Sequence, residues 1–491
     1  MKKQATLRSL LLGLVVFCWA PAALAEVPED HEDVSDELEL PVTAPMQITK
    51  ACLSCHEETA AEVMATTHWT WSDEQEVAGK GRVNYGKRNA FNNFCISVSG
   101  NEPRCTSCHA GYGWRDSTFD FTDESRVDCL VCHDTTGTYQ KHPKHAGMPA
   151  GFTGDPKIDA NPVDLVHVAE NAGPPTRQNC LSCHANGGGG NNVKHGDIDT
   201  SLISPSVAID VHMAPKGEDF TCQDCHATKE HAISGHALVV SPGKSIQIGC
   251  TGCHDTDDVH PKLGRILSKH LDRVACQTCH IPRFAKKNAT KMTWDWSAAK
   301  DPASLPADER EIVEDGHPVY VAMKGRFTYA KDVVPEYAWY DGHAEMYALG
   351  QAIDPSAVTT LNAPVATRGS EDAKIHPFKV HRGKQIYDAK QKILIPPKLF
   401  PSGDDAAEAF WKSFDWARAA AAGMKASGLE FSGEYGFAAT ASWWPINHMV
   451  SPRSEALGCR DCHPKTGQGR LDWKALGYDG DPRYTRRKTH R

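Results

Sequence analysis

The sequence has few long hydrophobic runs and no surplus of positive charge. Hydrophobic residues make up 40% of its 491 positions, and the formal net charge is −9. The acidic balance argues against a nucleic-acid partner, because phosphates are bound by an excess of lysine and arginine. One apolar stretch of note lies at the N-terminus, and it is too short for a membrane-spanning helix. We therefore expect no nucleic-acid partner and no stable membrane insertion.

The N-terminal stretch has the layout of an export signal. Lys2 and Arg8 flank its basic start, an apolar core follows, and small residues offer a cleavage site after Ala25. A lipoprotein anchor at Cys18 is less favoured, because the bulky Phe17 stands where a small residue is expected. The signal predicts export to an oxidising compartment, most simply a bacterial periplasm.

Sixteen of the 18 cysteines fall into eight copies of Cys-x-x-Cys-His, a pattern that a disulfide scaffold does not explain. Two thiols at this spacing add to the two vinyl groups of a haem, and the adjacent histidine then ligates the iron. A zinc site gives no reason for a histidine after every second cysteine. The motifs therefore predict eight covalent c-type haems (haem 1 to haem 8 in chain order), attached and ligated by Cys52, Cys55 and His56; Cys105, Cys108 and His109; Cys129, Cys132 and His133; Cys180, Cys183 and His184; Cys222, Cys225 and His226; Cys250, Cys253 and His254; Cys276, Cys279 and His280; and Cys459, Cys462 and His463.

Each iron accepts a second axial ligand, and the histidines outside the motifs are numerous enough to supply them. We favour histidines within or near the haem-dense stretch: His68, His195, His212, His231, His236, His270 and His448. Second choices are His260 and His145, and weaker candidates far from any motif are His317, His343, His376 and His381. Any one of them has the alternative of being an ordinary surface or core histidine.

Two residues stand apart from the repeated pattern. Cys95 belongs to no motif and has no partner once Cys18 is removed, so it is either a buried inert thiol or a reactive one. Lys194 lies in a glycine-rich run from Gly187 to Asp197, where the flexible backbone can approach a macrocycle. A lysine in such a run is most often simply solvated.

Four segments together give the chain a resemblance to the octahaem tetrathionate reductase family of periplasmic c-type cytochromes. They are the run from Gly187 to Asp197 and the segments 210–213, 274–282 and 444–450, beside the eight motifs. The resemblance implies that haem 2, attached by Cys105 and Cys108, is the catalytic haem, that Lys194 ligates its iron and that Cys95 is the thiol on the substrate side.

A catalytic iron needs one open face, and this limits how Lys194 can bind. If Lys194 lay opposite His109, both axial positions would be filled, so lysine must replace His109 for substrate to reach the iron. The sequence leaves open whether His109 is displaced, and three other lysines remain as substitutes for Lys194: Lys144, Lys157 and Lys216.

The predicted fold class is mainly α with much irregular structure, built around a closely packed haem array. Glycines and prolines interrupt long helical patterns, so short helices are expected after each motif. Between His280 and Cys459 lie 178 residues without a motif. Their aromatic runs predict ordinary core, and residues 404–427 have the spacing of an amphipathic helix that covers the haems. The predicted organisation is a signal peptide (1–25), an acidic disordered leader (26–48), one octahaem cytochrome domain (49–470, with haems 1–7 in 49–285 and the haem-poor region plus haem 8 in 286–470) and a basic tail (471–491).

The leading hypothesis is a periplasmic oxidoreductase that reduces tetrathionate or a similar sulfur oxyanion to thiosulfate. Its small anionic substrate needs local cations, and Lys87, Arg88 and Arg104 are nearest in sequence to the second motif. Expected redox partners are a quinol-oxidising protein or a small periplasmic cytochrome. Two alternatives remain: an enzyme acting on nitrite or hydroxylamine, which would not need Cys95, and a pure electron carrier with eight six-coordinate irons.

Overall fold

The computed structural model describes residues 37–38, 40–77, 81–91, 97–235, 248–255, 260 and 269–485. The predicted signal peptide, most of the acidic leader, Cys95, His236 and the last six residues lie outside this part. About 25% of the structure is helix and 21% is strand. None of the described helices is long and apolar enough to cross a membrane.

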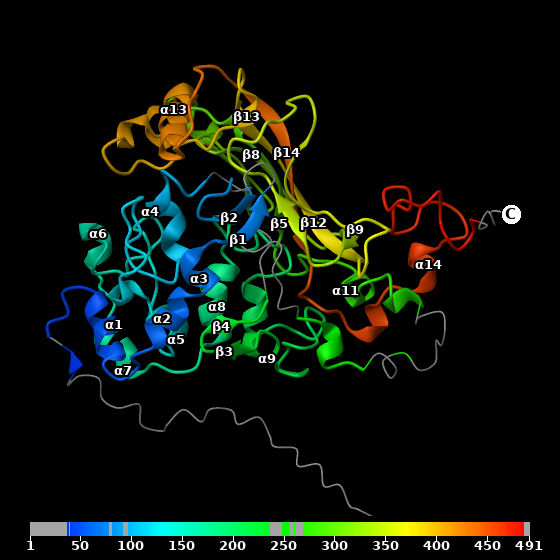
Figure 1. Ribbon diagram of the computed structural model, residues 1–491, viewed down its shortest axis with the longest axis horizontal. Helices are drawn as coiled ribbons and strands as arrows, with labels where there is room; N and C mark the ends of the chain where they lie inside the picture. Colours follow the sequence, from blue (N-terminus) through cyan, green and yellow to red (C-terminus); the bar gives the residue numbers. More distant parts are fainter. Residues whose placement is uncertain are drawn as a thin grey trace, which may run out of the picture.

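The N-terminal part consists of short helices joined by loops, as expected for a chain interrupted by glycine and proline (Figure 1). Two small hairpins interrupt it, β1 (Asp73–Val77) with β2 (Gly81–Tyr85) and β3 (Thr228–Lys229) with β4 (Ala232–Ile233). The helices are α1 (Met46–Leu53), α2 (Thr59–Met64), α3 (Thr67–Thr70), α4 (Glu102–Cys105), α5 (Leu130–His133), α6 (Pro156–Asp159), α7 (Leu165–Glu170), α8 (Arg177–His184), α9 (Cys222–Cys225) and α11 (Cys276–His280).

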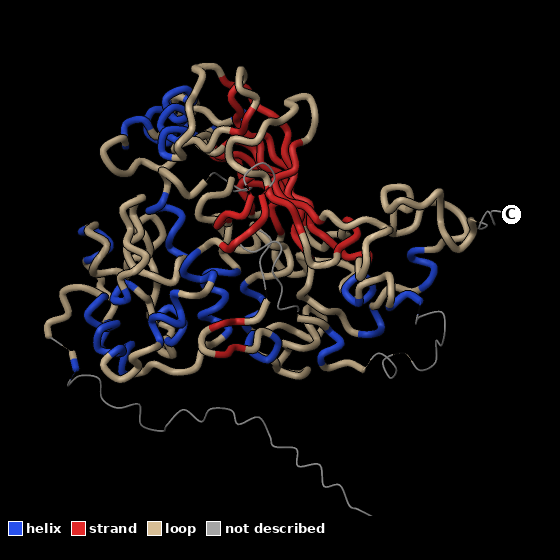
Figure 2. The backbone as a smooth tube through the Cα atoms, viewed as in Figure 1, coloured by secondary structure: helices blue, strands red, loops and turns tan. Residues whose placement is uncertain are grey.

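A ten-stranded sheet occupies most of the haem-poor region (Figure 2), so the predicted irregular structure is present but the mainly α character of the predicted fold is not supported. Strands β12 and β14 form its centre, pairing antiparallel from Phe378 opposite Pro445 to Asp388 opposite Tyr435. The strands are β5 (Thr290–Asp295), β6 (Glu311–Glu314), β7 (His317–Val321), β8 (Gly325–Ala330), β9 (Glu336–Tyr340), β10 (Ala344–Met346), β11 (Thr359–Pro364), β12 (Lys374–Asp388), β13 (Ile393–Leu394) and β14 (Tyr435–Pro445).

The predicted amphipathic helix is present in a shorter form that packs on the sheet. Residues 404–427 contain α12 (Phe410–Ser413) and α13 (Trp416–Ala426), and the Asp415 carboxylate caps α13 by accepting the N–H groups of Ala417 and Arg418. A Cβ on Gly423 would stand 1.9 Å from the Pro396 carbonyl oxygen, so only glycine permits this close approach.

The main hydrophobic core lies between α13 and the sheet and reaches the glycine-rich run. Trp294, Trp296 and Trp416 are buried in it, which confirms the prediction that these aromatic residues form core. The same cluster includes Val193 and Trp444, so the sheet supports the loop that carries Lys194. Strands β12 and β14 run from the region of α13 toward α11, linking this core to the haem-motif part (Figure 1).

The last described segment, 471–485, also has a definite place. Leu471 and Leu476 are buried with Trp339 of β9, and the segment follows α14 (Cys459–Cys462), which carries the eighth motif. The chain therefore packs around the eighth motif beyond the boundary where the sequence suggested a tail.

Candidate functional site

Most attachment motifs form a helical turn that gathers their three side chains. The histidine N–H donates to the carbonyl of the first cysteine, four residues earlier, at 2.8–3.1 Å in five of them: His56, His133, His226, His254 and His463. The fourth and seventh motifs end α8 and α11. This turn brings two thiols and an imidazole to one side of the backbone, as covalent haem attachment requires.

Six motif histidines face a second histidine at nearly constant separation. The pairs and their ring-centre distances are His68 with His184 at 6.2 Å, His133 with His231 at 6.4 Å, His212 with His254 at 6.0 Å, His226 with His448 at 6.3 Å, His260 with His280 at 6.0 Å, and His270 with His463 at 6.2 Å. An iron between two imidazoles requires roughly this spacing, since each metal–nitrogen bond is about 2 Å and each nitrogen lies about 1 Å from its ring centre. The side chains therefore fit bis-histidine haem.

Five of the favoured distal histidines lie in these pairs, together with His260, a second choice. His195 packs instead against Trp444, with ring centres 5.2 Å apart. His145 pairs with His142, and no described histidine ring faces His56. The four weaker candidates lie in the sheet region: His317 stacks on Tyr329, His343 is exposed, and His376 and His381 are buried in β12.

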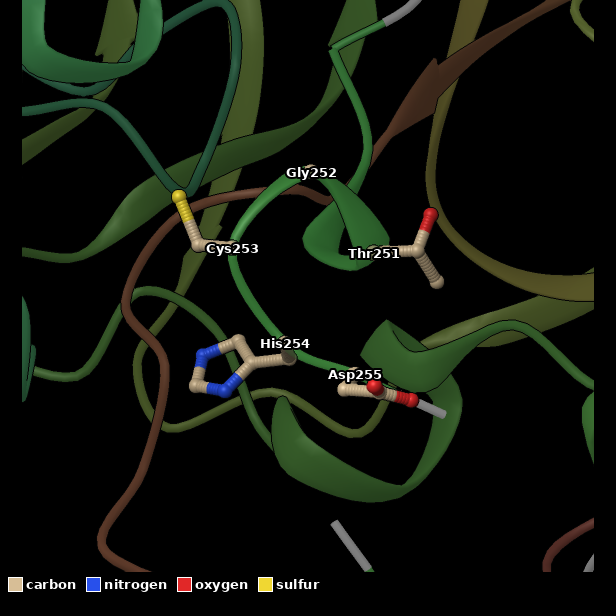
Figure 3. A pocket seen from close by; sticks show the side chains of 5 residues that line it. All are labelled: Thr251, Gly252, Cys253, His254 and Asp255. Atoms are coloured by element: carbon tan, nitrogen blue, oxygen red, sulfur yellow. The ribbon is translucent and has the colours of Figure 1, made fainter. Parts of the chain in front are cut away.

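The sixth motif lines an open cavity of about 330 Å³, bounded by Thr251, Gly252, Cys253, His254 and Asp255. Figure 3 shows the side chains of Cys253 and His254 projecting to the same side of the loop, while Thr251 projects to the other.

His184 of the fourth motif also lies beside open space. Surrounding residues lower its pKa to about 3 by burial, yet part of its ring surface is accessible. A space beside the ring that could hold a macrocycle explains why the ring is enclosed by protein but still exposed.

The second motif departs from the others at its histidine. His109 is 0% exposed, and it is the one motif histidine that is buried. Its N–H donates to Thr106 rather than to the first cysteine, and its backbone is extended after a 3-10 turn. The ring Nε2–H donates to the Trp69 carbonyl at 2.7 Å. The nitrogen that would bind iron is therefore engaged in a hydrogen bond, which bears on the question, left open by the sequence, of whether His109 is displaced.

Aromatic side chains enclose the His109 ring on several sides. Ring centres lie 4.9 Å away for Trp69, 5.6 Å for Trp71, 5.0 Å for Trp114 and 5.6 Å for Phe119. Burial among them lowers the pKa of His109 to about 3, so the ring is neutral. The motif spacing gave no sign of this enclosure. The density of tryptophan and phenylalanine between residues 69 and 121 was the available signal.

Lys194 lies beside the second motif. Burial, assisted by the positive charge of Lys87, lowers the pKa of Lys194 to about 7, and the Cys108 thiol opposes this shift. The neutral amine is the form that can ligate iron. Its Nζ also lies 4.7 Å from the Trp444 ring centre. The three lysines considered as substitutes, Lys144, Lys157 and Lys216, are all exposed.

Contacts from the sheet region fix the loop around Lys194. The Lys379 side chain of β12 is buried, and its Nζ donates to the carbonyls of Val193 and Lys194 at 2.8 and 3.0 Å and to the Thr290 hydroxyl at 2.6 Å. A Cβ at Gly187 would stand 3.1 Å from Lys194 Cδ, so glycine there makes room for the lysine stem. Lys379 could not be identified from the sequence, because nothing near it in sequence marks a haem site.

Several basic side chains lie near the second motif. Lys87 Nζ lies 3.6 Å from the Trp71 ring centre, and the Arg88 guanidinium lies 3.8 Å from that of Phe121. Lys141, buried nearby, forms an ion pair with Asp128 at 2.9 Å and is thereby neutralised. Arg104 is partly buried on α4.

The position of Cys95 lies outside the described residues, but its flank does not. Val98 is buried in a cluster with Trp71 and Trp114, and Cys105 and Cys108 pack against the same cluster. The chain therefore returns to the second motif three residues after Cys95.

The thiols of neighbouring motifs lie close together in a definite order. Four pairs are within hydrogen-bonding reach: Cys52 with Cys129, Cys108 with Cys183, Cys180 with Cys222, and Cys250 with Cys276. Three more interact electrostatically: Cys132 with Cys180, Cys225 with Cys253, and Cys279 with Cys459. The motifs thus follow the order 1, 3, 4, 5, 6, 7, 8, and the second motif branches from the fourth.

Comparisons with known proteins agree with this architecture. A family model described as bacterial cytochrome c matches residues 291–466. The octaheme cytochrome c from Shewanella oneidensis, solved by crystallography, is 49% identical, with a TM-score of 0.82 over 92% of this chain and 98% of that one. A protein of Archaeoglobus fulgidus described as uncharacterized is 25% identical over 232 residues, covering 39% of this chain and 76% of its own length.

Proposed function

Because the chain belongs to the octahaem c-type cytochromes, of the octahaem tetrathionate reductase type that its motifs indicated, we propose that it reduces a sulfur oxyanion, most simply tetrathionate, to thiosulfate. The protein is a multihaem cytochrome c with covalently attached haem. In this proposal eight haems occupy the eight motifs, and haem 2 is the catalytic one.

The withdrawal of His109 is the observation that carries the proposal. The other seven motif histidines are exposed or half-buried, whereas His109 is buried among aromatic rings, and its Nε2–H donates to the Trp69 carbonyl. Lys194 interacts electrostatically with Cys108, and burial depresses the pKa of its amine, which favours the neutral form. If Lys194 supplies one axial ligand and His109 none, the opposite face of haem 2 stays open. A pure electron carrier would not need this arrangement.

The residues around haem 2 suit a disulfide-like anionic substrate. Bound haem supplies electrons one at a time. The Cys95 thiolate attacks the central sulfur–sulfur bond of tetrathionate, releasing one thiosulfate and leaving a cysteine thiosulfonate. Two electrons then restore the thiolate and release the second thiosulfate. Lys87 and Arg88 hold the sulfonate ends by charge, and Lys141 contributes little because Asp128 neutralises it.

The motif order supports delivery of electrons from either end of the array. The thiols of motifs 3, 4 and 5 are close neighbours, and Cys108 of motif 2 touches Cys183 of motif 4. Electrons arriving through haem 3 or haem 5 therefore both reach haem 4 before haem 2. We place the protein in the periplasm, with a quinol-oxidising protein or a small cytochrome as donor.

Electron paramagnetic resonance of the oxidised holoprotein, with and without tetrathionate, tests the proposal. The wild type should show one iron that is not bis-histidine and that responds to tetrathionate. Lys194→Ala should change that signal and abolish tetrathionate reduction, while the matched variant of an exposed lysine, Lys216→Ala, should change neither.

Steady-state assays of Cys95→Ser separate the substrate classes. Loss of tetrathionate reduction with retention of nitrite or hydroxylamine activity supports thiol chemistry on sulfur. Full tetrathionate activity in this variant would contradict the role of Cys95. A wild-type spectrum with eight bis-histidine irons and no activity toward any of these substrates would leave only electron transfer.

A further inference from the structure

Three of the distal or motif histidines hydrogen-bond a carboxylate through the nitrogen that faces away from the iron. His231 Nδ1 lies 2.8 Å from Glu62 Oε2, His448 Nδ1 lies 3.1 Å from Asp197 Oδ2, and His463 Nδ1 lies 2.6 Å from Asp481 Oδ1. A carboxylate acceptor fixes the imidazole tautomer and increases electron donation to the metal. Since this stabilises ferric over ferrous iron, it lowers the reduction potential of the haem.

Haems 3 and 5 have an acceptor behind both axial histidines. The ring Nδ1–H of His133 donates to the Gly173 carbonyl at 2.9 Å, and that of His226 donates to the Ser234 carbonyl at 3.0 Å. Their partners, His231 and His448, are the carboxylate-bonded ones. These two haems therefore combine the features that lower potential.

Haem 4 lies in a different environment. Its axial pair is His68 and His184, and within the described part of the chain no acceptor is bonded to either ring. The rings of His68 and His184 therefore lack the acceptors that increase electron donation to iron at haems 3 and 5, and the potential of haem 4 should lie above theirs.

Haem 4 is also the junction of the array. Cys180 of its motif neighbours Cys132 of motif 3 and Cys222 of motif 5, and Cys183 lies against Cys108 of motif 2. The fourth motif is therefore a neighbour of the second, third and fifth motifs.

We propose that Glu62 and Asp197 lower the potentials of haems 3 and 5 so that haem 4, between them and beside haem 2, is the higher-potential site where electrons collect. This inference rests on the axial pairs of the proposed function, but not on its substrate. It makes Glu62 and Asp197 positioning and tuning residues, distinct from the groups that contact substrate.

Redox titration of the holoprotein, followed by electron paramagnetic resonance, tests this proposal. The interplanar angles divide the haems into two classes of signal, and the variants below identify the individual haems. The two imidazoles of haem 5 are nearly parallel, at 14°, as are those of haem 7, at 19°. Those of haems 3 and 4 are steeply inclined, at 64° and 70°. Parallel pairs give rhombic signals, whereas perpendicular pairs give signals with a large maximal g value. A His68→Met variant identifies the haem 4 signal as the one that disappears.

Asp197→Asn should change the reduction equilibrium of the haem with one rhombic signal about tenfold in favour of the ferrous form. This change corresponds to a rise of about 59 mV in its one-electron reduction potential. Glu62→Gln should do the same for one large-g signal. Asp388→Asn is the matched control, because Asp388 is also buried and accepts backbone N–H groups, from Lys390, Gln391 and Ser432, but touches no imidazole.

In the wild type, the haem 4 signal should titrate at higher potential than both signals shifted by these variants. The inference is overturned if the signals persist unshifted in both variants, or if haem 4 titrates below haems 3 and 5. Such a result leaves the tetrathionate proposal standing. Absence of the bis-histidine signals themselves would instead contradict the axial pairs. Because Glu62 is part-exposed, Glu62→Gln remains informative if Asp197→Asn does not fold.

Discussion

Replacement of Lys379 by methionine tests whether the haem-poor sheet region positions the loop at the second haem site. The Lys379 ammonium is the donor to two loop carbonyls, those of Val193 and Lys194, in a place closed to water. Methionine keeps the length and apolar stem but removes the donor. A buried carbonyl left without a donor costs about 1–3 kcal/mol, and the relief of burying an ammonium returns part of this. We expect Lys379→Met to lower the free energy of unfolding by about 2–4 kcal/mol.

The same variant should alter the lysine-bound iron without touching it. Because Lys379 holds the backbone of Lys194, its loss should weaken or abolish the Lys194-dependent resonance signal while the bis-histidine signals stay. Denaturant unfolding followed by circular dichroism gives the first quantity, and paramagnetic resonance gives the second. Lys291→Met is the control, because Lys291 is buried on the same sheet, over Trp294 and Phe327. An unchanged Lys194 signal in Lys379→Met would refute the argument that β12 positions this loop.

Three further substitutions test local features of the structure. His109→Phe should leave the haem 2 signal in place. It should lower the free energy of unfolding by about 1–3 kcal/mol, because the Trp69 carbonyl loses its donor. A new spin state of haem 2, with eight haems still counted by the pyridine haemochrome assay, would show that His109 is a ligand. Gly187→Val should shift the Lys194-dependent signal, because a Cβ there already meets Lys194 Cδ at 3.1 Å; an identical spectrum would mean that the loop relaxes freely. Gly423→Ala should lower the free energy of unfolding by about 3 kcal/mol or more, since its Cβ would overlap the Pro396 carbonyl, and a melting temperature equal to that of the wild type would contradict the packing of α13.

The haem motifs could be predicted from sequence because attachment chemistry fixes the spacing of the two thiols and the histidine. Distal ligands are harder to predict, since the His448 ring, which follows β14, meets the His226 ring of the fifth motif only through the fold. Nearness in sequence favoured His68 and His231, whose rings face motif histidines, and also His195, whose ring packs on Trp444. The choice of His260 over His195 depends on tertiary placement that no local pattern encodes.

The sheet was missed for a physical reason that β12 makes clear. Positions 375–381 of this strand are all buried, because both faces are covered, so the alternation typical of a half-exposed strand is absent. Lys379 and His381 within it further disguise a core strand as a polar segment. By contrast, the prediction that aromatic residues form the core holds for Trp294, Trp296 and Trp416, because a tryptophan side chain is buried for its apolar surface whether a helix or a strand carries it.

The placement of Lys379 and Trp444 on the sheet affects how catalytic activity should be judged in shortened forms of the protein. A shortened protein without residues 290–445 would keep all eight attachment motifs and the red colour that they confer. It would nevertheless lose the contacts of Lys379 and Trp444 that hold the loop around Lys194. The colour of such a protein would then not indicate whether it is catalytically active. The segment without haem motifs would determine whether the haems support catalysis as well as electron transfer.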